Sequence, residues 1–168
     1  SWIQLFGDEY KAFETYAKTY PDNCVLLIDT YNVLKSGIIN AIKVSKDVLE
    51  PQGNTLKGVR LDSGDLAYLS KEVRKILNIN GLENCKILAS NSLDEYIIAD
   101  LMNQGACIDI FGVGERLITA KSEPVFGGVY KLVAVENDGN IVPRIKLSEN
   151  IEKVTNPGYK TVWRLFDK

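Results

Sequence analysis

The sequence predicts an α/β protein: a parallel sheet covered by helices, followed by a short antiparallel β segment. Three observations support this. Four short apolar runs alternate with helical patterns, the resulting order is β-α-β-α-β-α-β, and after Glu123 the pattern changes to alternating apolar and polar residues. Apolar strands that alternate with helices are typical of a parallel sheet with helices packed against it. The antiparallel part therefore differs in class from what precedes it.

The four strands are predicted at apolar runs rich in branched residues and flanked by polar or turn-forming residues. They are CVLLID at 24–29, KGVRLD at 57–62, CKILASN at 85–91 and CIDIFGVG at 107–114. Each run is short enough for a strand, and each is followed by a polar segment. These four runs define the predicted parallel sheet.

Helices are predicted between the strands, where apolar residues recur at steps of three and four. The pattern covers residues 31–48, 66–79 and 93–104. The clearest case is 66–79, with Leu66, Leu69, Val73, Ile76 and Leu77 on one face. Ser92 is the predicted N-cap of the third helix.

The segment after Glu123 predicts a β-hairpin. GGVYKLVAVE and IVPRIKL flank an Asp-Gly turn, which is a strong hairpin signal. Residues 154–167 predict a loop that leads into a last strand. We therefore divide the chain into residues 1–123, a βα portion, and residues 124–168, an antiparallel tail expected to pack on the same domain.

Four βα strands are too few for a complete eight-unit barrel, which needs about 250 residues. The chain is thus expected to be either a small doubly wound sheet or about half of a barrel. It begins with Ser-Trp and has no initiator Met, which favours a piece of a larger barrel.

Composition excludes several classes of protein. The net charge is −2 and the pI about 5.3, so the chain lacks the clustered basic residues of a nucleic-acid-binding face. No apolar run is long enough to span a membrane, and the start does not resemble a signal peptide.

The absence of histidine from the chain excludes the usual zinc sites and any Ser-His-Asp triad within it. The cysteines Cys24, Cys85 and Cys107 are far apart in sequence and odd in number, which argues against a disulfide framework. We expect buried, reduced thiols in a cytoplasmic protein.

Polar residues follow every predicted strand, and the carboxyl ends of parallel strands meet at one edge of a sheet. They are Asp29–Asn32, Arg60–Asp65, Ser90–Ser92 and Gly112–Arg116. An arginine offers phosphate a planar fork, while an aspartate accepts hydrogen bonds from neighbouring sugar hydroxyls. Glycines ahead of a helix let backbone N–H groups approach an anion. The combination predicts a site for a phosphorylated sugar, with a magnesium ion as a further candidate.

Plainer interpretations of these motifs stay open. FGVGERL also suits an ordinary tight turn, and Arg60 with Asp62 also suits a local ion pair beside helix caps. Asp65 in particular is expected to be a helix cap. The basic tail, comprising Lys146, Lys153, Lys160 and Arg164, suits either a solvated β surface or a loop that faces a polyphosphate.

Six segments in this order resemble the nicotinate phosphoribosyltransferases: LIDTYN, GVRLDSGDL, ILASNSLDE, FGVGERL, GGVYKLVAV and KVTNPGYKTVWR. The resemblance covers residues 1–164 and corresponds to the C-terminal portion of the family. It implies an irregular phosphoribosyltransferase-type α/β barrel with an added N-terminal domain. It also implies a cytoplasmic enzyme of NAD salvage. That enzyme joins nicotinate to phosphoribosyl pyrophosphate, giving nicotinate mononucleotide and pyrophosphate, with ATP as co-substrate and Mg²⁺ as cofactor.

The resemblance also implies roles for residues of this chain. Asp62 is expected at the ribose hydroxyls and Asp29 on the ribose or magnesium side, both as catalytic residues. Arg60 is expected at the phosphate side. Further substrate contacts are implied for Ser90, Asn91, Gly112, Gly114, Glu115, Lys146, Lys153 and Lys160, the lysines facing ATP or pyrophosphate.

The family's phosphorylated histidine and its base-binding residues precede the segment that resembles this chain. We therefore expect the isolated 168 residues to be inactive, and to associate through open sheet edges or as a homodimer. The expected partners are small molecules, without nucleic acid or membrane. Two alternatives stay open: a non-catalytic α/β module that binds nucleotides or a partner chain, and a phosphoribosyltransferase for another pyridine base.

Overall fold

A computed structural model of the chain describes residues 2–128, 130–145, 147, 154 and 156–166. The chain divides into two compact units, and the boundary between them in the sequence falls after Pro124. The first unit holds the parallel sheet and its helices, and the second holds an antiparallel hairpin. Each unit is described by itself.

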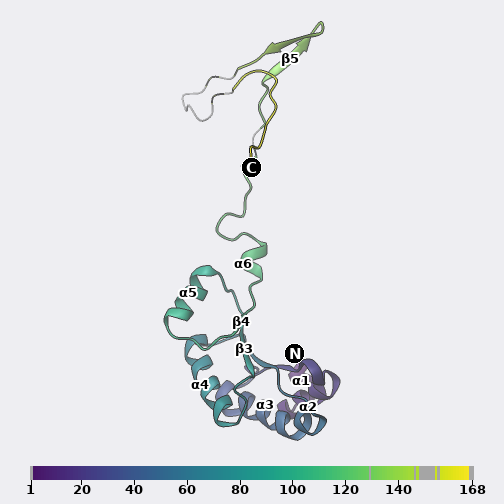
Figure 1. Ribbon diagram of the computed structural model, residues 1–168, viewed down its shortest axis with the longest axis vertical. Helices are drawn as coiled ribbons and strands as arrows, with labels where there is room; N and C mark the ends of the chain where they lie inside the picture. Colours follow the sequence, from purple (N-terminus) through teal and green to yellow (C-terminus); the bar gives the residue numbers. More distant parts are fainter. Residues whose placement is uncertain (1, 129, 146, 148–153, 155, 167–168) are drawn as a thin grey trace. The chain divides into compact units, whose positions relative to one another are not determined.

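The first unit alternates helices and strands (Figure 1). Its strands are β1 (Val25–Leu27), β2 (Gly58–Leu61), β3 (Lys86–Ala89) and β4 (Ile110–Phe111). Its α-helices are α1 (Trp2–Phe6), α2 (Glu9–Thr19), α3 (Ile38–Val44), α4 (Leu66–Ile79), α5 (Glu95–Asn103) and α6 (Glu115–Ile118). Shorter helical turns are η1 (Pro21–Asn23), η2 (Val33–Gly37), η3 (Ser45–Leu49) and η4 (Glu50–Gln52).

The four strands form one parallel sheet whose order in space, β1-β2-β3-β4, follows their order in the chain. Leu27 lies opposite Arg60, Arg60 opposite Leu88, and Leu88 opposite Ile110. The helices follow the same sequence, with α2 against α3, α3 against α4 and α4 against α5. All four strands therefore end at the same edge of the sheet.

The core lies between one face of the sheet and the helices. Side chains alternate between the faces of a strand. In β2, Val59 and Leu61 are fully buried while Arg60 between them is exposed. Val73 and Leu77 of α4 are also fully buried. Burial of such side chains is the main stabilising contribution to the unit.

Gly37, the last residue of η2, packs directly against the end of β1. A Cβ atom at this position would lie 1.9 Å from the carbonyl oxygen of Ile28. Only glycine permits so close an approach of two backbone segments. Gly37 therefore allows η2 to lie directly against Ile28, the residue between β1 and Asp29.

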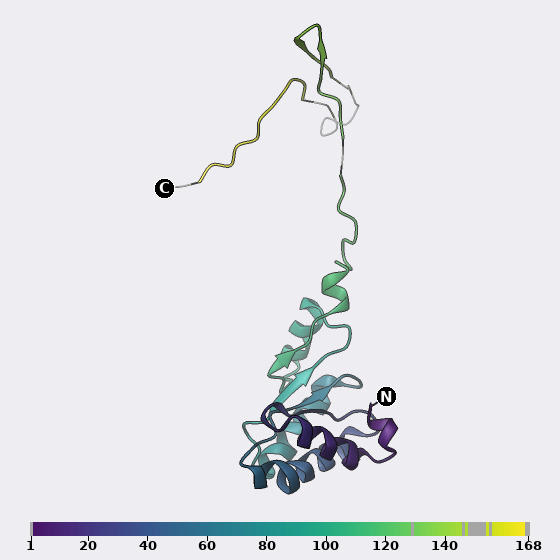
Figure 2. The same ribbon diagram turned by 90° about the vertical axis from the view of Figure 1, so that its right-hand side faces the viewer.

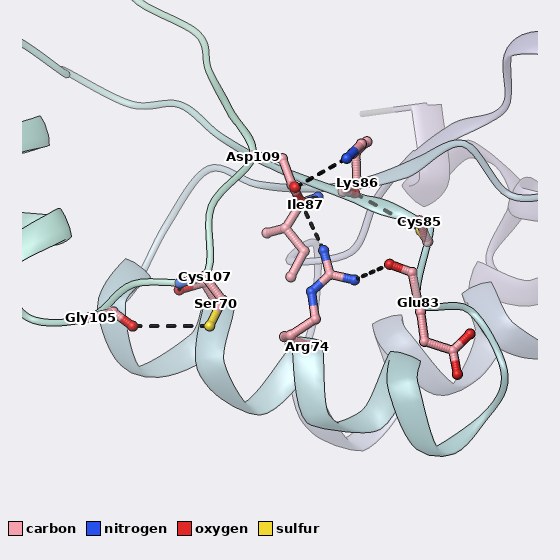
Figure 3. A network of polar contacts seen from close by, with 9 residues as sticks. All are labelled: Ser70, Arg74, Glu83, Cys85, Lys86, Ile87, Gly105, Cys107 and Asp109. Carbon is pink, nitrogen blue, oxygen red and sulfur yellow. Dashed lines mark hydrogen bonds and ion pairs between the residues drawn. The ribbon is translucent and has the colours of Figure 1, made fainter.

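A polar network joins the elements at the amino end of the sheet (Figure 3). Oδ2 of Asp109 accepts hydrogen bonds from Nη2 of Arg74 and from the Ile87 amide, each at 2.8 Å, and Oδ1 pairs with Nζ of Lys86 at 3.4 Å. Arg74 also donates through Nη1 to the carbonyl of Glu83 at 3.1 Å. Burial opposes ionisation of Asp109, but these donors outweigh it and lower the pKa of the carboxyl. The network ties α4 to β3 and to the start of β4.

The sequence prediction agrees with the structure for most of the first unit. The bounds of α4 match the predicted 66–79, and every predicted strand is present, although shorter. No element was predicted before residue 24, whereas α1 and α2 occupy that segment and pack on each other, drawn in purple in Figure 2. The predicted cap of α5 is wrong: Asp94, whose Oδ1 accepts from the Ile97 amide at 2.9 Å, is the N-cap, and Ser92 is not.

The second unit contains the predicted hairpin, β5 (Ala134–Asn137) paired antiparallel with β6 (Asn140–Pro143). Asp138 and Gly139 form the turn with φ values of 49° and 80°, the left-handed conformation that a two-residue hairpin requires. The predicted last strand is wrong for the part that the structure describes, because residues 156–166 contain no strand. Whether this tail packs on the first unit stays a prediction.

The cysteines differ in burial. Cys24 and Cys85 are buried as predicted, and burial raises the pKa of their thiols to about 11 and about 12. The prediction is wrong for Cys107, which is only partly buried. All three thiols are free. Across the residues that the structure describes, no helix combines the length and apolarity needed to cross a membrane.

Candidate active site

Three polar side chains form a closed triangle at the end of the sheet where the carboxyl ends of the strands lie. Arg60 of β2 donates through Nε to Oγ of Ser90 and through Nη2 to Oδ1 of Asp62, each at 2.9 Å. The Ser90 hydroxyl donates to the same oxygen of Asp62. The Ser90 hydrogen bond is the main cause of a lowered pKa at Asp62; partial burial opposes it and Arg60 assists it. Asp62 is therefore a carboxylate at neutral pH.

The triangle is open to solvent on one side. The side chains of Arg60 and Asp62 are 45% and 42% exposed. Within the described residues, neither Nη1 of Arg60 nor Oδ2 of Asp62 makes a hydrogen bond. One donor nitrogen and one acceptor oxygen are thus available to a ligand.

Asp29, which follows β1, holds the loop after β2. Its Oδ2 accepts hydrogen bonds from the Asp62 amide at 2.9 Å and from the Ser63 hydroxyl at 2.5 Å. A carboxylate that accepts a neighbour's backbone N–H fixes that loop in place. The first three strands are therefore connected at this edge by hydrogen bonds.

The loop after β4 lies against the same group. The Gly112 amide donates to the Ala89 carbonyl at 2.8 Å, and a Cβ on Gly112 would lie 3.3 Å from Cβ of Ser90. Beyond it, the successive amides of residues 113–116 meet no hydrogen-bond acceptor among the described residues. A row of free N–H groups ahead of a helix is an arrangement that binds anions.

The loop after β3 has an uncommon backbone. Asn91 and Ser92 have consecutive positive φ values, 90° and 50°. Asparagine tolerates this conformation better than most residues, and such positions cluster at ligand sites. Asn91 is exposed and directly follows Ser90 of the triangle in the chain.

The structure thus brings together many of the residues predicted from sequence. Contacts link Asp29, Arg60, Asp62, Ser90 and Gly112. Asn91 directly follows Ser90, and Gly114 and Glu115 lie two and three positions after Gly112. Asp65 is the N-cap of α4, accepting from the Tyr68 amide at 2.9 Å, as predicted.

Of the three tail lysines, the structure describes Lys160 alone. Lys160 lies in the second unit, where Nζ donates to the carbonyls of Gly158, at 3.0 Å, and of Asn156. It therefore holds its own loop. Lys146 and Lys153 lie outside the described residues.

Sequence reasoning assigned no role to two interactions that the structure shows. One is the hydrogen bond from Ser63 to Asp29, and the other is an ion pair between Arg116 and Asp94. A signal existed for Asp94, which stands directly before the helical pattern and is a strong N-cap residue. Nothing in the spacing indicated its pairing with a residue 22 positions away.

Comparison with known proteins shows which family the chain belongs to. The chain is 52% identical, over 168 residues, to the nicotinate phosphoribosyltransferase of Bacillus subtilis strain 168, with 99% of this chain and 33% of that protein covered. It is 45% identical over 165 residues to the nicotinate phosphoribosyltransferase of Dictyostelium discoideum, covering 94% of this chain and 27% of that protein. This chain belongs to the nicotinate phosphoribosyltransferase family. The resemblance noted from the sequence is thereby confirmed.

The family match is partial in length, since the chain spans about a third or less of these curated relatives. A crystal structure of human nicotinic acid phosphoribosyltransferase has a similar fold, with a TM-score of 0.58 and 36% identity. That match covers 62% of this chain and 22% of the human one. No family profile matches the chain.

Proposed function

We propose that the chain forms the phosphoribosyl half of a nicotinate phosphoribosyltransferase active site. In the complete protein, other residues would bind the base. The reaction breaks the bond between C1 of the ribose and pyrophosphate, which leaves with the electron pair, and forms a bond from C1 to the ring nitrogen of nicotinate. The observation that carries the proposal is the Arg60–Asp62–Ser90 triangle lying against a loop whose four successive amides, at 113–116, bind no acceptor in the described part of the chain.

The free atoms of the site match the parts of a phosphoribosyl group. Arg60 offers Nη1 to a phosphate oxygen. Asp62 offers Oδ2 to the ribose hydroxyls, with Ser90 and Asn91 beside it. The amides around Gly114 and Glu115 would hold the 5′-phosphate. Gly112 permits this loop to lie against Ser90.

Charge is the catalytic contribution that these residues make. As pyrophosphate leaves, C1 becomes oxocarbenium-like and positive. The carboxylate of Asp62, kept ionised by Ser90 and Arg60, stabilises that charge. Asp29 contributes by holding the Asp62 loop in position through its two hydrogen bonds.

A magnesium ion fits the donor set. Mg²⁺ is usually bound by one or two carboxylates together with substrate phosphates. Asp29 and Asp62 are adjacent, and each has one carboxylate oxygen without a hydrogen bond among the described residues. Two carboxylates are thus available to an ion whose other ligands would be substrate phosphates and water. When bound, it would neutralise the leaving pyrophosphate.

The sheet is proposed to be an arc of an α/β barrel. A doubly wound sheet reverses its strand order at a switch point, whereas β1-β2-β3-β4 runs in one direction through the described strands. The remaining strands would come from the rest of the protein, and the isolated chain would associate through its edges. In this proposal ATP is a co-substrate. Lys146, Lys153 and Lys160 would face ATP or pyrophosphate.

Incubation of the complete protein with nicotinate, phosphoribosyl pyrophosphate, ATP and Mg²⁺ tests the proposal. We expect equal amounts of nicotinate mononucleotide and pyrophosphate, and no turnover by the 168 residues alone. Nicotinamide and quinolinate, supplied in parallel, distinguish a transferase for another pyridine base. Failure of the complete protein to bind phosphoribosyl pyrophosphate by calorimetry would support the non-catalytic module instead.

A further inference from the structure

The loop after β4 is weakly held by the rest of the first unit. From Gly112 to Ala120 every residue is exposed except Arg116, and α6 buries no residue. Leu117 and Ile118 are 69% and 82% exposed, so neither side chain anchors the helix by burial among the described residues. The amides proposed to hold phosphate belong to this segment, and within the described residues side-chain packing does not set their position.

Arg116 supplies an attachment. Its Nη1 donates to Oδ2 of Asp94, and the two side chains are only 27% and 18% exposed. The other oxygen of Asp94 caps α5 by accepting from the Ile97 amide at 2.9 Å. One carboxylate therefore joins the first turn of α5 to the first turn of α6.

The Arg116–Asp94 ion pair is more shielded from solvent than a typical surface ion pair. Nε of Arg116 is buried and has no hydrogen-bond partner within the described residues. A buried donor left unpaired is costly, so the ion pair with Asp94 is the interaction that favours this position of the guanidinium among the described residues. A partly shielded ion pair is also less screened by salt than an exposed one. Its partner Asp94 lies on the loop that carries Ser90 and Asn91.

We propose that Asp94 and Arg116 are positioning residues that hold the amides of residues 113–116 at a set place relative to Ser90. Neither side chain contacts substrate in this proposal, which rests on the proposed function. The pair acts on the binding of the 5′-phosphate, because that is the group the amides would receive. It has no part in recognition of the base.

The complete protein carrying Asp94→Asn tests this role. Asparagine caps a helix about as well as aspartate, so α5 keeps its cap while the ion pair loses its charge. We expect the KM for phosphoribosyl pyrophosphate to rise roughly 5- to 50-fold. The KM for nicotinate and the melting temperature should stay close to the wild-type values.

Asp8→Asn is the matched control. Asp8 caps α2 in the same way, accepting from the Lys11 amide at 3.2 Å, and has no ion pair in the described part of the chain. We expect this variant to have wild-type KM values. Arg116→Gln should reproduce the Asp94→Asn effect, and the double variant should be no worse than either single one. Arg116→Lys should recover part of the affinity.

The outcomes separate this inference from the proposed function. Wild-type turnover, with an unchanged KM for phosphoribosyl pyrophosphate in both Asp94→Asn and Arg116→Gln, would overturn the positioning role alone. A lower melting temperature without a change in that KM would show a purely structural pair and would overturn the positioning role as well. A wild-type protein that does not use phosphoribosyl pyrophosphate would remove the proposed function and this role with it.

Discussion

Two Arg–Asp pairs stand at opposite ends of one sheet and differ in how much of their bonding capacity is used. At the amino end, both oxygens of Asp109 are occupied and Arg74 binds a second acceptor, the Glu83 carbonyl. At the carboxyl end, Arg60 and Asp62 each keep an atom without a partner among the described residues. The pair at the amino end is also less exposed, at 19% and 29% against 45% and 42%.

The comparison shows that an Arg–Asp pair can have either a structural or a ligand-binding role. A pair that binds several further groups within the protein, as Arg74 and Asp109 do, stabilises the elements that it joins. A pair that leaves a donor and an acceptor in solvent adds little stability but can exchange water for a ligand. Sequence spacing alone does not distinguish a structural pair from a ligand-binding pair. The number of hydrogen bonds that each pair makes within the protein does distinguish them.

Replacing the two arginines gives the largest expected contrast. In the complete protein, Arg60→Ala should cost on the order of 2–4 kcal/mol of transition-state stabilisation, roughly 30- to 700-fold in kcat/KM. The melting temperature should change little. Arg60→Lys should recover only part of the activity, because an ammonium cannot make the planar two-pronged contact.

Arg74→Ala is the matched substitution at the other end. It should lower the melting temperature and leave the activity per folded molecule unchanged. Steady-state kinetics and thermal unfolding on the same preparations measure both quantities. Normal kinetics in Arg60→Ala with only a lower melting temperature would remove the central assignment.

Asp62→Asn tests the charge at the carboxyl end without changing shape. We expect kcat to fall about 10- to 100-fold, because positive charge develops at C1 and the amide no longer stabilises it. The KM for phosphoribosyl pyrophosphate should change less than kcat. An effect confined to KM would show that Asp62 binds substrate without contributing to the chemical step.

Asp109→Asn tests the amino end in the same way. We expect a loss of about 1–3 kcal/mol in the free energy of unfolding, because charged hydrogen bonds to partly buried groups are weakened. Urea unfolding measures this loss. Activity per folded molecule should stay at the wild-type level, and a selective loss of activity would contradict a purely structural role.

The smallest expected effect is on the pH dependence of stability. The pKa of Asp109 is lower in the folded than in the unfolded protein, so the ionised form favours folding. This contribution is complete above the unfolded value of about 3.9 and is lost as the pH falls through the lower folded pKa. The stability difference between wild type and Asp109→Asn should therefore shrink as the pH falls below about 4. A difference independent of pH over that range would contradict this linkage.

Much of this architecture follows from local sequence patterns. The α4 pattern was unambiguous because its apolar residues repeat at helical steps over four turns, and Asp65 stood where a cap belongs. The strand-end loops could be grouped because parallel strands end at one edge. The hairpin was readable from its Asp-Gly turn.

The remainder depended on contacts between residues distant in sequence. The pairing of Arg116 with Asp94 and the use of Asp29 to hold the Asp62 loop arise only when strands are neighbours. The mistaken cap at Ser92 has a local cause, since its positive φ excludes the extended backbone of an N-cap. α1 and α2 were not predicted: α1 has only five residues, and the apolar residues that α2 buries are Ala12, Phe13 and Ala17, two of them small.

The one-directional order of the strands has a consequence for how the protein is made. Each strand pairs with the one synthesised just before it, so every new βα unit meets a finished edge as it leaves the ribosome. The hydrogen bonds from Asp29 to the β2 loop can form before β3 exists, and Ser90 then closes the triangle. The strand order thus allows the site to be assembled in the order of translation, with the newest strand leaving an open edge for the next.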